Sequence, residues 1–230
     1  MITLSAHQPA YLPWLGYFNK IANSDVFVIL DNVQYERGSF VNRNRIKGPN
    51  GIFWLTVPLK KTGHIGKMIS EMEVADNNWR DKHKKSLKAV YGRAPYYWEY
   101  EDWFAELLYI INPPQTESIW GMWELLRFDT DQIEYASDAL PHTRSPKQQL
   151  IIELCKHYCA DRFIFGAKGR DYCDIDLFKR EGIEPLFQDF KCIEYPQLWG
   201  EFVPKLSVID ALMNVGAKRT RALIIEGWKP

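Results

Sequence analysis

The stretch ITLSAHQPAYLPWLGYFNKIANSDVFVILD, residues 2–31, decides the fold. Residues 2–6 predict a short strand, and residues 16–23 predict a helix with its apolar side chains on one face. The run VFVILD, residues 26–31, is continuously apolar and ends in an acid, which is typical of a strand covered on both faces. Strand, helix and strand in this order predict a βαβ unit, and therefore a parallel sheet.

The next segment predicts a β-hairpin. SFVNRNRI (residues 39–46) and IFWLTVPL (residues 52–59) flank the turn sequence KGPNG. Because side chains alternate along a strand, Arg43 and Arg45 should share one face of the first arm.

Residues 77–128 have a helical pattern, with predicted helices at 103–111 and 118–128 after a first one that begins near Trp79. We interpret this region as a helical insertion. The remaining chain alternates between strands and helices. These elements are predicted at 132–137 (strand), 146–158 (helix, capped by Ser145 and Pro146), 162–166 (strand), 174–182 (helix), 184–190 (strand) and 206–214 (helix). The sequence thus predicts a single α/β domain over residues 1–230, with a mainly parallel Rossmann-like sheet, a β-hairpin and a helical insertion.

Composition narrows the class of protein. Lysine plus arginine and aspartate plus glutamate both number 29, and a formal net charge of zero argues against a broad nucleic-acid surface. No apolar run is long enough to span a membrane and no secretory signal is visible, so we expect a cytoplasmic protein. Cys155 and Cys159 are one helical turn apart, but a reduced buried thiol pair is favoured over a metal site, and no metal is predicted.

Polar side chains follow the predicted strands where ligands bind in parallel α/β sheets. His7 and Gln8 follow the first strand, while Asp31, Asn32 and Gln34 end the second. If the strands are neighbours, these groups converge on one crevice, at which the following helix points its amide groups. Asp31 could instead only cap a turn.

Cationic residues could hold a phosphate or diphosphate at this crevice. Lys168 and Gly169, in GAKGRDY after a predicted strand, are the better candidates for an anion site. Arg43 and Arg45 could form a fork for a diphosphate, or they could be ordinary solubilising residues of an edge hairpin.

Aromatic residues make up 14% of the chain and suit a core, a subunit contact in an oligomer, or a pocket that stacks on a ring. Tyr11 and Trp14 are candidates for stacking on a ligand, and the alternative for both is the core. His83 on an aromatic helical face is interpreted as a hydrogen-bonded core histidine.

The loop Pro-x-x-Gly-Tyr, residues 13–17, is similar to the histidine-glycine-histidine loop of adenylate-forming nucleotidyltransferases. Tyr17 stands in place of the second histidine of that pattern. This likeness leaves open a nucleotidyltransferase or an ATP-dependent amide ligase, for which ATP with magnesium would be the cofactor.

Over nearly its whole length the chain resembles the WbqC-like protein family. The resemblance rests on HQPAYLPWLGYFNKI, SDVFVILDNVQY, FVNRNRIKGPNG, FWLTVPLKK and YPQLWGEFVPKLSVIDALMNVG. Members of that family occur among genes for O-antigen and other surface polysaccharides, and glycine transfer to an amino sugar has been proposed for one. The resemblance implies tailoring of a nucleotide-linked amino sugar, with an activated acyl or aminoacyl donor.

Together these points predict a glycyl or related acyl transferase in which His7 is the base for the acceptor amine and Asp31 orients it. Aminoacyl-tRNA is the less attractive donor because of the neutral charge. A non-catalytic sugar-nucleotide-binding or scaffold protein is the third hypothesis.

Overall fold

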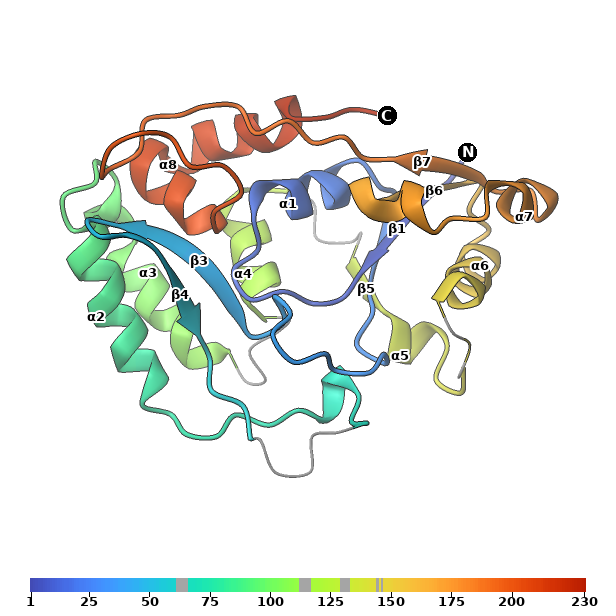
Figure 1. Cartoon of the computed structure of the whole chain (residues 1–230), viewed down its shortest axis with the longest axis horizontal. Helices are drawn as coiled ribbons and strands as arrows, with labels where there is room; N and C mark the ends of the chain where they lie inside the picture. The colour runs from blue at the N-terminus through green and yellow to red at the C-terminus, as the bar shows by residue number, and fades with distance from the viewer. Residues whose placement is uncertain (61–65, 112–116, 129–132, 144, 146) are drawn as a thin grey trace.

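The computed structural model describes residues 1–60, 66–111, 117–128, 133–143, 145 and 147–230. Its centre is a five-stranded parallel sheet in the order β5-β2-β1-β6-β7, and a two-stranded antiparallel hairpin, β3-β4, stands beside it (Figure 1). The strands are β1 (Thr3–His7), β2 (Val26–Ile29), β3 (Arg43–Gly48), β4 (Gly51–Thr56), β5 (Ile133–Tyr135), β6 (Arg162–Phe165) and β7 (Glu184–Phe187).

Eight α-helices and two short 3-10 helices lie within the described residues. The α-helices are α1 (Leu15–Ala22), α2 (Trp79–Tyr91), α3 (Tyr97–Ile110), α4 (Glu117–Leu125), α5 (Ala136–Ala139), α6 (Lys147–His157), α7 (Ile175–Arg180) and α8 (Val208–Glu226); the 3-10 helices are η1 (Ile69–Glu71) and η2 (Ala167–Asp171). The prediction of an α/β fold with a parallel sheet, a hairpin and additional helices is confirmed.

The opening stretch forms the predicted βαβ unit. β1 pairs in parallel with β2, with Leu4 opposite Val26 and His7 opposite Ile29, and α1 connects them. Along β2, successive side chains alternate between two hydrophobic clusters. Phe27 and Ile29 belong to the larger cluster, which also holds side chains of α1–α4 and α8, whereas Val28 belongs to a smaller cluster with side chains of α6 and α7. The sheet is therefore covered on both faces, which explains why the strands are continuously apolar.

The arms of the hairpin are shorter than predicted. Its first arm begins at Arg43 rather than at residue 39, and its second arm ends at Thr56. Pro58 has no backbone N–H group, so the ladder cannot continue far beyond Thr56. The shared face of Arg43 and Arg45 is confirmed, since both are half-buried while the residues between and after them are buried.

The helices of residues 77–128 are present, with displaced boundaries. α4 ends at Leu125 rather than at residue 128. α3 begins at Tyr97, well before the predicted start at residue 103, because its buried face continues through Tyr97 and Tyr100. Residues 112–116, which follow the predicted helix at 103–111, lie outside the described residues. α2, α3 and α4 contribute to the same hydrophobic cluster as the hairpin and α8.

Three boundaries in the last third also differ from the predictions. Residues 136–137, predicted as strand, begin α5, and β7 ends at Phe187 rather than at residue 190. α8 continues to Glu226, beyond a break at Gly216, whose φ of 73° is not helical. The predicted helix cap at residues 145–146 involves residue 146, which lies outside the described residues.

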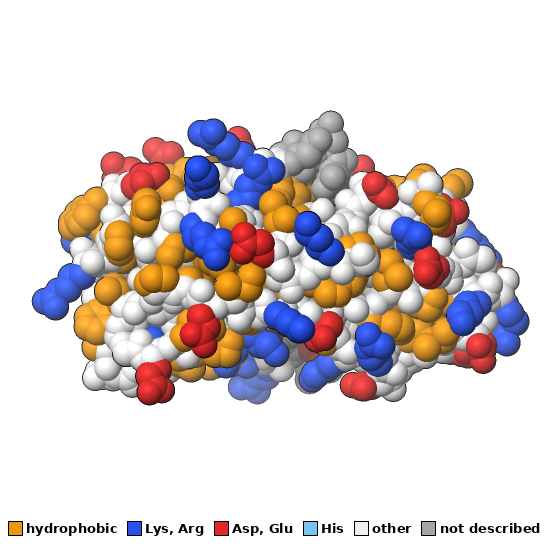
Figure 2. All heavy atoms as spheres, turned by 90° about the horizontal axis from the view of Figure 1, so that it is seen from above, with side chains coloured by type: hydrophobic (Ala, Val, Ile, Leu, Met, Phe, Trp, Pro, Cys, Tyr) orange, Lys and Arg blue, Asp and Glu red, His pale blue; other side chains and the backbone are white. Residues whose placement is uncertain are grey.

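Charges of both signs are interspersed with apolar side chains on the face seen in Figure 2, and neither sign forms a continuous field there. This pattern agrees with the zero net charge. None of the described helices has both the length and the apolar character needed to cross a membrane.

Candidate functional site

A cleft of about 510 Å³ opens beyond the carboxyl ends of β1 and β6. β1 is the central strand: the chain leaves it for β2 on one side, and β6 pairs with it on the other. The gap between β1 and β6 is thus the topological switch point of the sheet, where open α/β sheets bind their ligands. Its volume is in the range of small-molecule pockets. We call it the β1–β6 cleft.

His7, the last residue of β1, lines this cleft and is exposed to the solvent within it. Its Nδ1 lies 2.9 Å from the carbonyl oxygen of Gln8. Removal from bulk water by the surrounding protein lowers the pKa of His7 to about 4, the nearby Lys20 lowers it further, and the bond to Gln8 acts in the opposite direction. The imidazole is therefore neutral at pH 7.

Tyr17 contacts both His7 and the carbonyl oxygen of Gln8. Its hydroxyl donates to the same carbonyl oxygen of Gln8 at 3.2 Å, and its ring packs edge-on against His7 with centroids 5.0 Å apart. Tyr17 is almost fully buried. The residue that stands in place of the second histidine of a nucleotidyltransferase loop therefore supports His7 and does not face the cleft as a free polar group.

Lys20 on α1 is a buried cation at the same cleft. Only 3% of it is exposed, and its Nζ donates a hydrogen bond to the carbonyl oxygen of Ala6 at 2.9 Å. Burial lowers the pKa of Lys20 to about 7. Within the described part of the chain no carboxylate is paired with it. Such a lysine is half protonated near neutral pH, and an anion bound beside it would favour the charged form.

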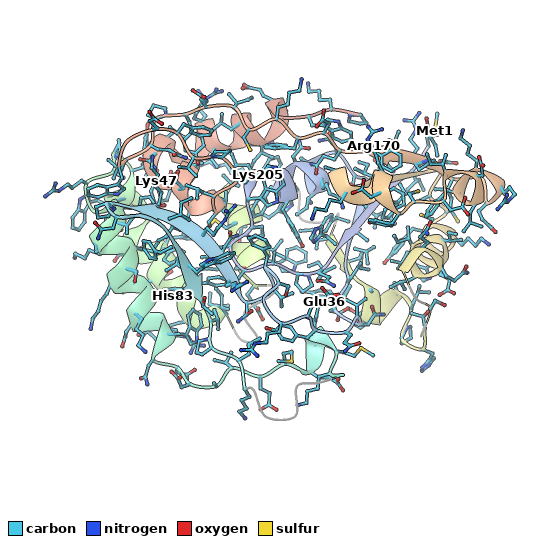
Figure 3. The ribbon with its side chains drawn as sticks, in the orientation of Figure 1. Met1, Glu36, Lys47, His83, Arg170 and Lys205 are labelled. Carbon is cyan, nitrogen blue, oxygen red and sulfur yellow. The ribbon has the colours of Figure 1, made fainter. Side chains whose placement is uncertain are left out.

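Two more lysines line the cleft from other elements. Lys168 lies in η2 after β6, and Lys205 approaches the start of α1 from the segment before α8 (Figure 3). The ammonium group of Lys205 is 5.9 Å from the centre of the Trp14 ring. Asp189 is the single acid among the described lining residues. The cleft therefore favours an anionic ligand.

Aromatic and apolar side chains form the remaining wall. Trp14 packs edge-on against Phe190 with centroids 5.2 Å apart, and both line the cleft. A Cβ atom on Gly16 would lie 2.3 Å from the Trp14 ring, so only glycine permits this close approach. Gly169 is constrained similarly, since its Cβ would lie 2.4 Å from Cβ of Phe165. The cleft can hold a ring beside its cationic groups.

A buried amide network fixes α1 relative to β7 and α8. Gln188 donates to the carbonyl oxygen of Gly16 at 2.9 Å and to Oδ1 of Asn19 at 2.7 Å. Asn19 in turn donates to the carbonyl oxygen of Ile224 at 2.7 Å. These bonds hold the helix that carries Lys20 in a defined position against the sheet.

Asp31 does not meet His7 in this structure. Its carboxylate accepts hydrogen bonds from the backbone N–H and the hydroxyl of Ser137, at 3.0 and 2.6 Å. It therefore ties the end of β2 to the start of α5, which is the turn-capping alternative. The prediction that Asp31 orients His7 has no geometric support, because the carbonyl oxygen of Gln8 binds Nδ1 instead.

Asn32 and Gln34 are likewise outside the β1–β6 cleft. Asn32 is half-buried, and its Oδ1 is buried without a hydrogen-bond partner among the described residues. Gln34 is exposed and forms an isolated bridge with Met68. Leu30, directly after β2, still lines the cleft, but the polar residues that follow it do not and so do not converge with those of the first strand.

Tyr11 lies in the hydrophobic core. Its side chain is fully buried, and its hydroxyl is 2.8 Å from Nδ1 of His83. The other ring nitrogen of His83 is 3.2 Å from the carbonyl oxygen of Thr56. Tyr11 is therefore not available to stack on a ligand, and the interpretation of His83 as a hydrogen-bonded core histidine is confirmed.

Arg43 and Arg45 lie on the hairpin and do not line the β1–β6 cleft. Their guanidinium carbons are 4.2 and 5.9 Å from the centre of the Trp54 ring. Arg45 donates to the carbonyl oxygen of Lys205 at 3.3 Å, and Arg43 donates to that of Gly38. The structure does not bring the pair together with Lys168, so a common diphosphate site with that residue is not supported.

The structure thus brings together a part of the predicted set with residues that sequence reasoning missed. The predicted members that line the cleft are His7, Gln8, Trp14, Lys168 and Gly169. The missed members include Lys20, Gln188, Asp189 and Lys205. Lys20 carries one usable signal, since it follows Gly16 and Tyr17 by a helical turn and so shares their face of α1.

Metal binding finds no support in the described residues, where no three histidine, cysteine or acidic side chains come together. Cys155 is buried, and burial raises the pKa of its thiol to about 12, whereas Cys159 is exposed.

The fold and cleft define an α/β protein with a cationic, aromatic-lined site at its switch point. The model of the WbqC-like protein family matches residues 8–222, and the chain belongs to that family. It is 30% identical over 220 residues to the uncharacterized protein Rv1507c of Mycobacterium tuberculosis, covering 92% of this chain and 93% of the relative. No solved structure matches the chain.

Proposed function

We propose that the protein transfers a glycyl or related small acyl group to the amine of a nucleotide-linked amino sugar held in the β1–β6 cleft. The observation that most directly supports this proposal is the state of the His7 imidazole. It is neutral, held through Nδ1 and without a partner at Nε2 among the described residues. An amine nucleophile must lose a proton as it attacks an acyl carbon, and a neutral imidazole can accept it.

The ligand class follows from the charges and the rings of the cleft. The diphosphate would lie near Lys20, Lys168 and Lys205. These three lysines outnumber the one carboxylate among the described lining residues. Trp14 would contact the base or the sugar ring. A nucleotide-linked sugar carries both the anion and the rings that such a site favours.

The proposed reaction is a simple acyl transfer. The amine nitrogen attacks the carbonyl carbon of the activated acyl donor and a C–N bond forms. The bond from that carbon to the thiolate, ester oxygen or phosphate of the donor breaks. The proton of the amine passes to Nε2 of His7 and then to the departing group.

A nucleotidyltransferase or ATP-dependent ligase is the second candidate, because the three lysines would also suit a triphosphate. Glycine-dependent exchange between ATP and pyrophosphate separates the two candidates. Exchange would mean that the protein activates glycine itself, and its absence would mean that the donor arrives activated.

Transfer itself is tested by incubating the protein with nucleotide-linked amino sugars and a glycyl thioester or aminoacyl-tRNA, followed by mass spectrometry of the sugar nucleotide. A glycyl adduct that forms with the wild type and not with His7→Ala supports the proposal. Sugar nucleotides that fail to bind, or that bind with equal affinity to a Lys20→Met, Lys168→Ala double variant, would contradict it. A scaffold protein would bind without any transfer.

A further inference from the structure

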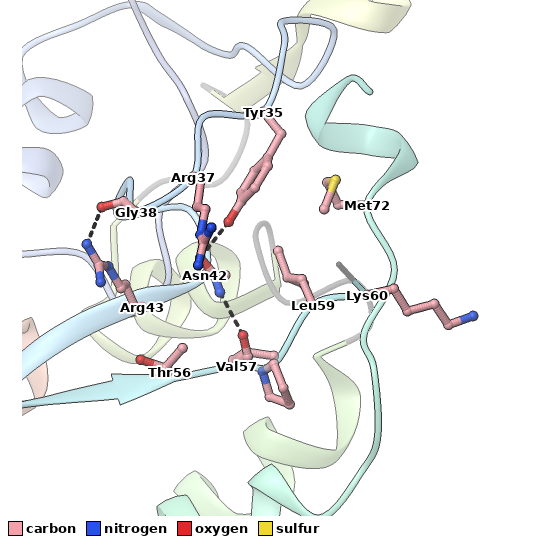
Figure 4. Close-up of a pocket in the computed structure, with 11 residues that line it drawn as sticks. Tyr35, Arg37, Gly38, Asn42, Arg43, Thr56, Val57, Leu59, Lys60 and Met72 are labelled. Atoms are coloured by element: carbon pink, nitrogen blue, oxygen red, sulfur yellow. Dashed lines mark hydrogen bonds between the residues drawn. The ribbon is translucent and has the colours of Figure 1, made fainter. Parts of the chain in front are cut away.

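A second cavity, of about 430 Å³, lies at the open end of the hairpin and shares no lining residue with the β1–β6 cleft (Figure 4). One wall is formed by residues 35–43, and the other by the end of β4 with the residues that follow it. Met72, directly after η1, completes the lining. We call it the Arg37–Arg43 pocket.

The charge of this pocket is one-sided. Arg37, Arg43 and Lys60 line it, and no acid is among the described lining residues. Lys60 extends outward in Figure 4 and pairs with Glu73, 2.6 Å away. The two guanidinium groups have no carboxylate partner in the described part of the chain.

Arg43 is held in place before any ligand binds. Its guanidinium lies over the Trp54 ring at 4.2 Å, and one Nη donates to the carbonyl oxygen of Gly38. Its Nε is buried without an acceptor among the described residues. Buried donors in folded proteins are normally satisfied, so this guanidinium carries unused hydrogen-bonding capacity.

Tyr35 and Asn42 add a polar surface beside Arg37 (Figure 4). The Tyr35 hydroxyl donates to Oδ1 of Asn42 at 3.2 Å, and Nδ2 of Asn42 donates to the carbonyl oxygen of Val57 at 2.7 Å. Burial raises the pKa of Tyr35, and the charges of Arg43 and Arg37 both oppose that rise.

The opposite wall is apolar and the frame is rigid. Val57, Pro58, Leu59 and Met72 supply the apolar contacts. Backbone hydrogen bonds join the frame, from Tyr35 to Lys67, from Val57 to Asn42, and from Lys60 to Glu73. The pocket thus has Arg37 and Arg43 in one wall, with the Arg43 guanidinium turned toward Gly38, and an apolar surface in the other (Figure 4).

We propose that the Arg37–Arg43 pocket is a binding site for a phosphate-bearing small molecule, whose phosphate is held by the two arginines and whose compact body rests on the apolar wall. Two guanidiniums without a carboxylate match a doubly charged phosphate monoester better than a singly charged carboxylate. This site is separate from the proposed acyl-transfer cleft and does not depend on that function.

Phenyl phosphate is the probe, and the indole N–H signal of Trp54 in protein labelled with ¹⁵N-tryptophan is the local readout. Trp54→Phe assigns the signal. Because Trp54 contacts Arg43, the signal should shift saturably as phenyl phosphate is added. Arg37→Ala should weaken this binding about tenfold or more, since it removes a charge-assisted hydrogen bond. Arg180→Ala, which removes an exposed arginine of α7, is the matched control and should bind as the wild type does.

Four results would overturn the proposal. The Trp54 signal could fail to shift, or it could titrate identically in Arg37→Ala and the wild type. Benzoate could also bind as tightly as phenyl phosphate, which would reject the phosphate class. A Trp54 shift that disappears in Lys168→Ala but persists in Arg37→Ala belongs to the first cleft and overturns it too. Arg37 is exposed, so its replacement should leave the fold intact.

Discussion

Nδ1 of His7 lies 2.9 Å from the carbonyl oxygen of Gln8, the residue that follows it in the chain. A carbonyl oxygen can only accept, so Nδ1 carries the proton and donates it, and Nε2 keeps its lone pair. Backbone geometry at the end of β1 thus selects the tautomer that a general base requires. Among the described residues no carboxylate binds His7, and that of Asp31 binds Ser137 instead.

The pH dependence of transfer should reflect the lowered pKa of His7, about 4. A base is active when deprotonated, so kcat should stay level as pH falls from 8 and should decline only below about pH 5. Lys20 contributes to the lowered pKa, and Lys20→Met should therefore move the decline to higher pH. Rate profiles of both proteins, with circular dichroism to confirm folding at each pH, provide the measurement. A decline near pH 6.5 in both would show an unperturbed histidine.

Because Lys20 is buried, the protein should be more stable at mildly alkaline pH than at neutral pH. Its pKa is about 7 in the folded state and 10.5 when exposed, so the unfolded chain binds more protons between these values. Burying the charged form of Lys20 lowers the free energy of unfolding. This loss is fully present below pH 7 and disappears as pH rises to about 10.5. Urea unfolding from pH 6 to 10 should show a rise in the free energy of unfolding that Lys20→Met reduces. Parallel curves for the two proteins would refute the lowered pKa.

Asp31→Ala should lower stability and leave catalysis intact. The change removes the acceptor of two hydrogen bonds from Ser137 and should cost about 1–3 kcal/mol in the free energy of unfolding. Asp31→Asn, which keeps one acceptor oxygen, should cost less and serves as the matched control. Denaturant unfolding and kcat are measured on the same preparations. A large fall in kcat in folded Asp31→Asn would return Asp31 to the catalytic group.

Gly16→Ala should disturb the wall of the β1–β6 cleft. Its Cβ would meet the Trp14 ring at 2.3 Å, so the ring must move, at a cost of about 1–3 kcal/mol in stability. Gly166→Ala is the control, because that glycine also lines the cleft but nothing lies within 4 Å of its Cβ position. Thermal unfolding and sugar-nucleotide binding should change for Gly16→Ala alone. Equal behaviour of the two variants would remove Trp14 from the site.

Much of this architecture was predictable from local patterns, and half of the site was not. The apolar run at residues 26–31 and the position of His7 after the first strand were sufficient to place a switch-point cleft. Asp31 was misjudged because the sequence does not reveal that Ser137 returns to the end of β2. Tyr11 and Trp14 are three residues apart in one loop, and only the fold puts one in the core and the other at the cleft.

Lys20 shares a helical face with Gly16 and Tyr17, but this signal alone does not reveal that the face is covered. A lysine in a helix normally reaches solvent, and nothing local indicates that α8 and the residues after β7 cover α1. Lys205 comes from a segment without regular structure whose path depends on the long-range contacts between Ser207, Arg45 and Leu12. Such groups reach the cleft by tertiary packing, for which the sequence offers no short-range pattern.

The most direct test of the central claim is to measure kcat and the sugar-nucleotide Kd for wild type and His7→Ala with an activated glycyl donor. Loss of the base should lower kcat by about a hundredfold or more and leave the Kd nearly unchanged. Unchanged kcat in a folded His7→Ala protein would contradict the account and leave the β1–β6 cleft as a binding site without this base.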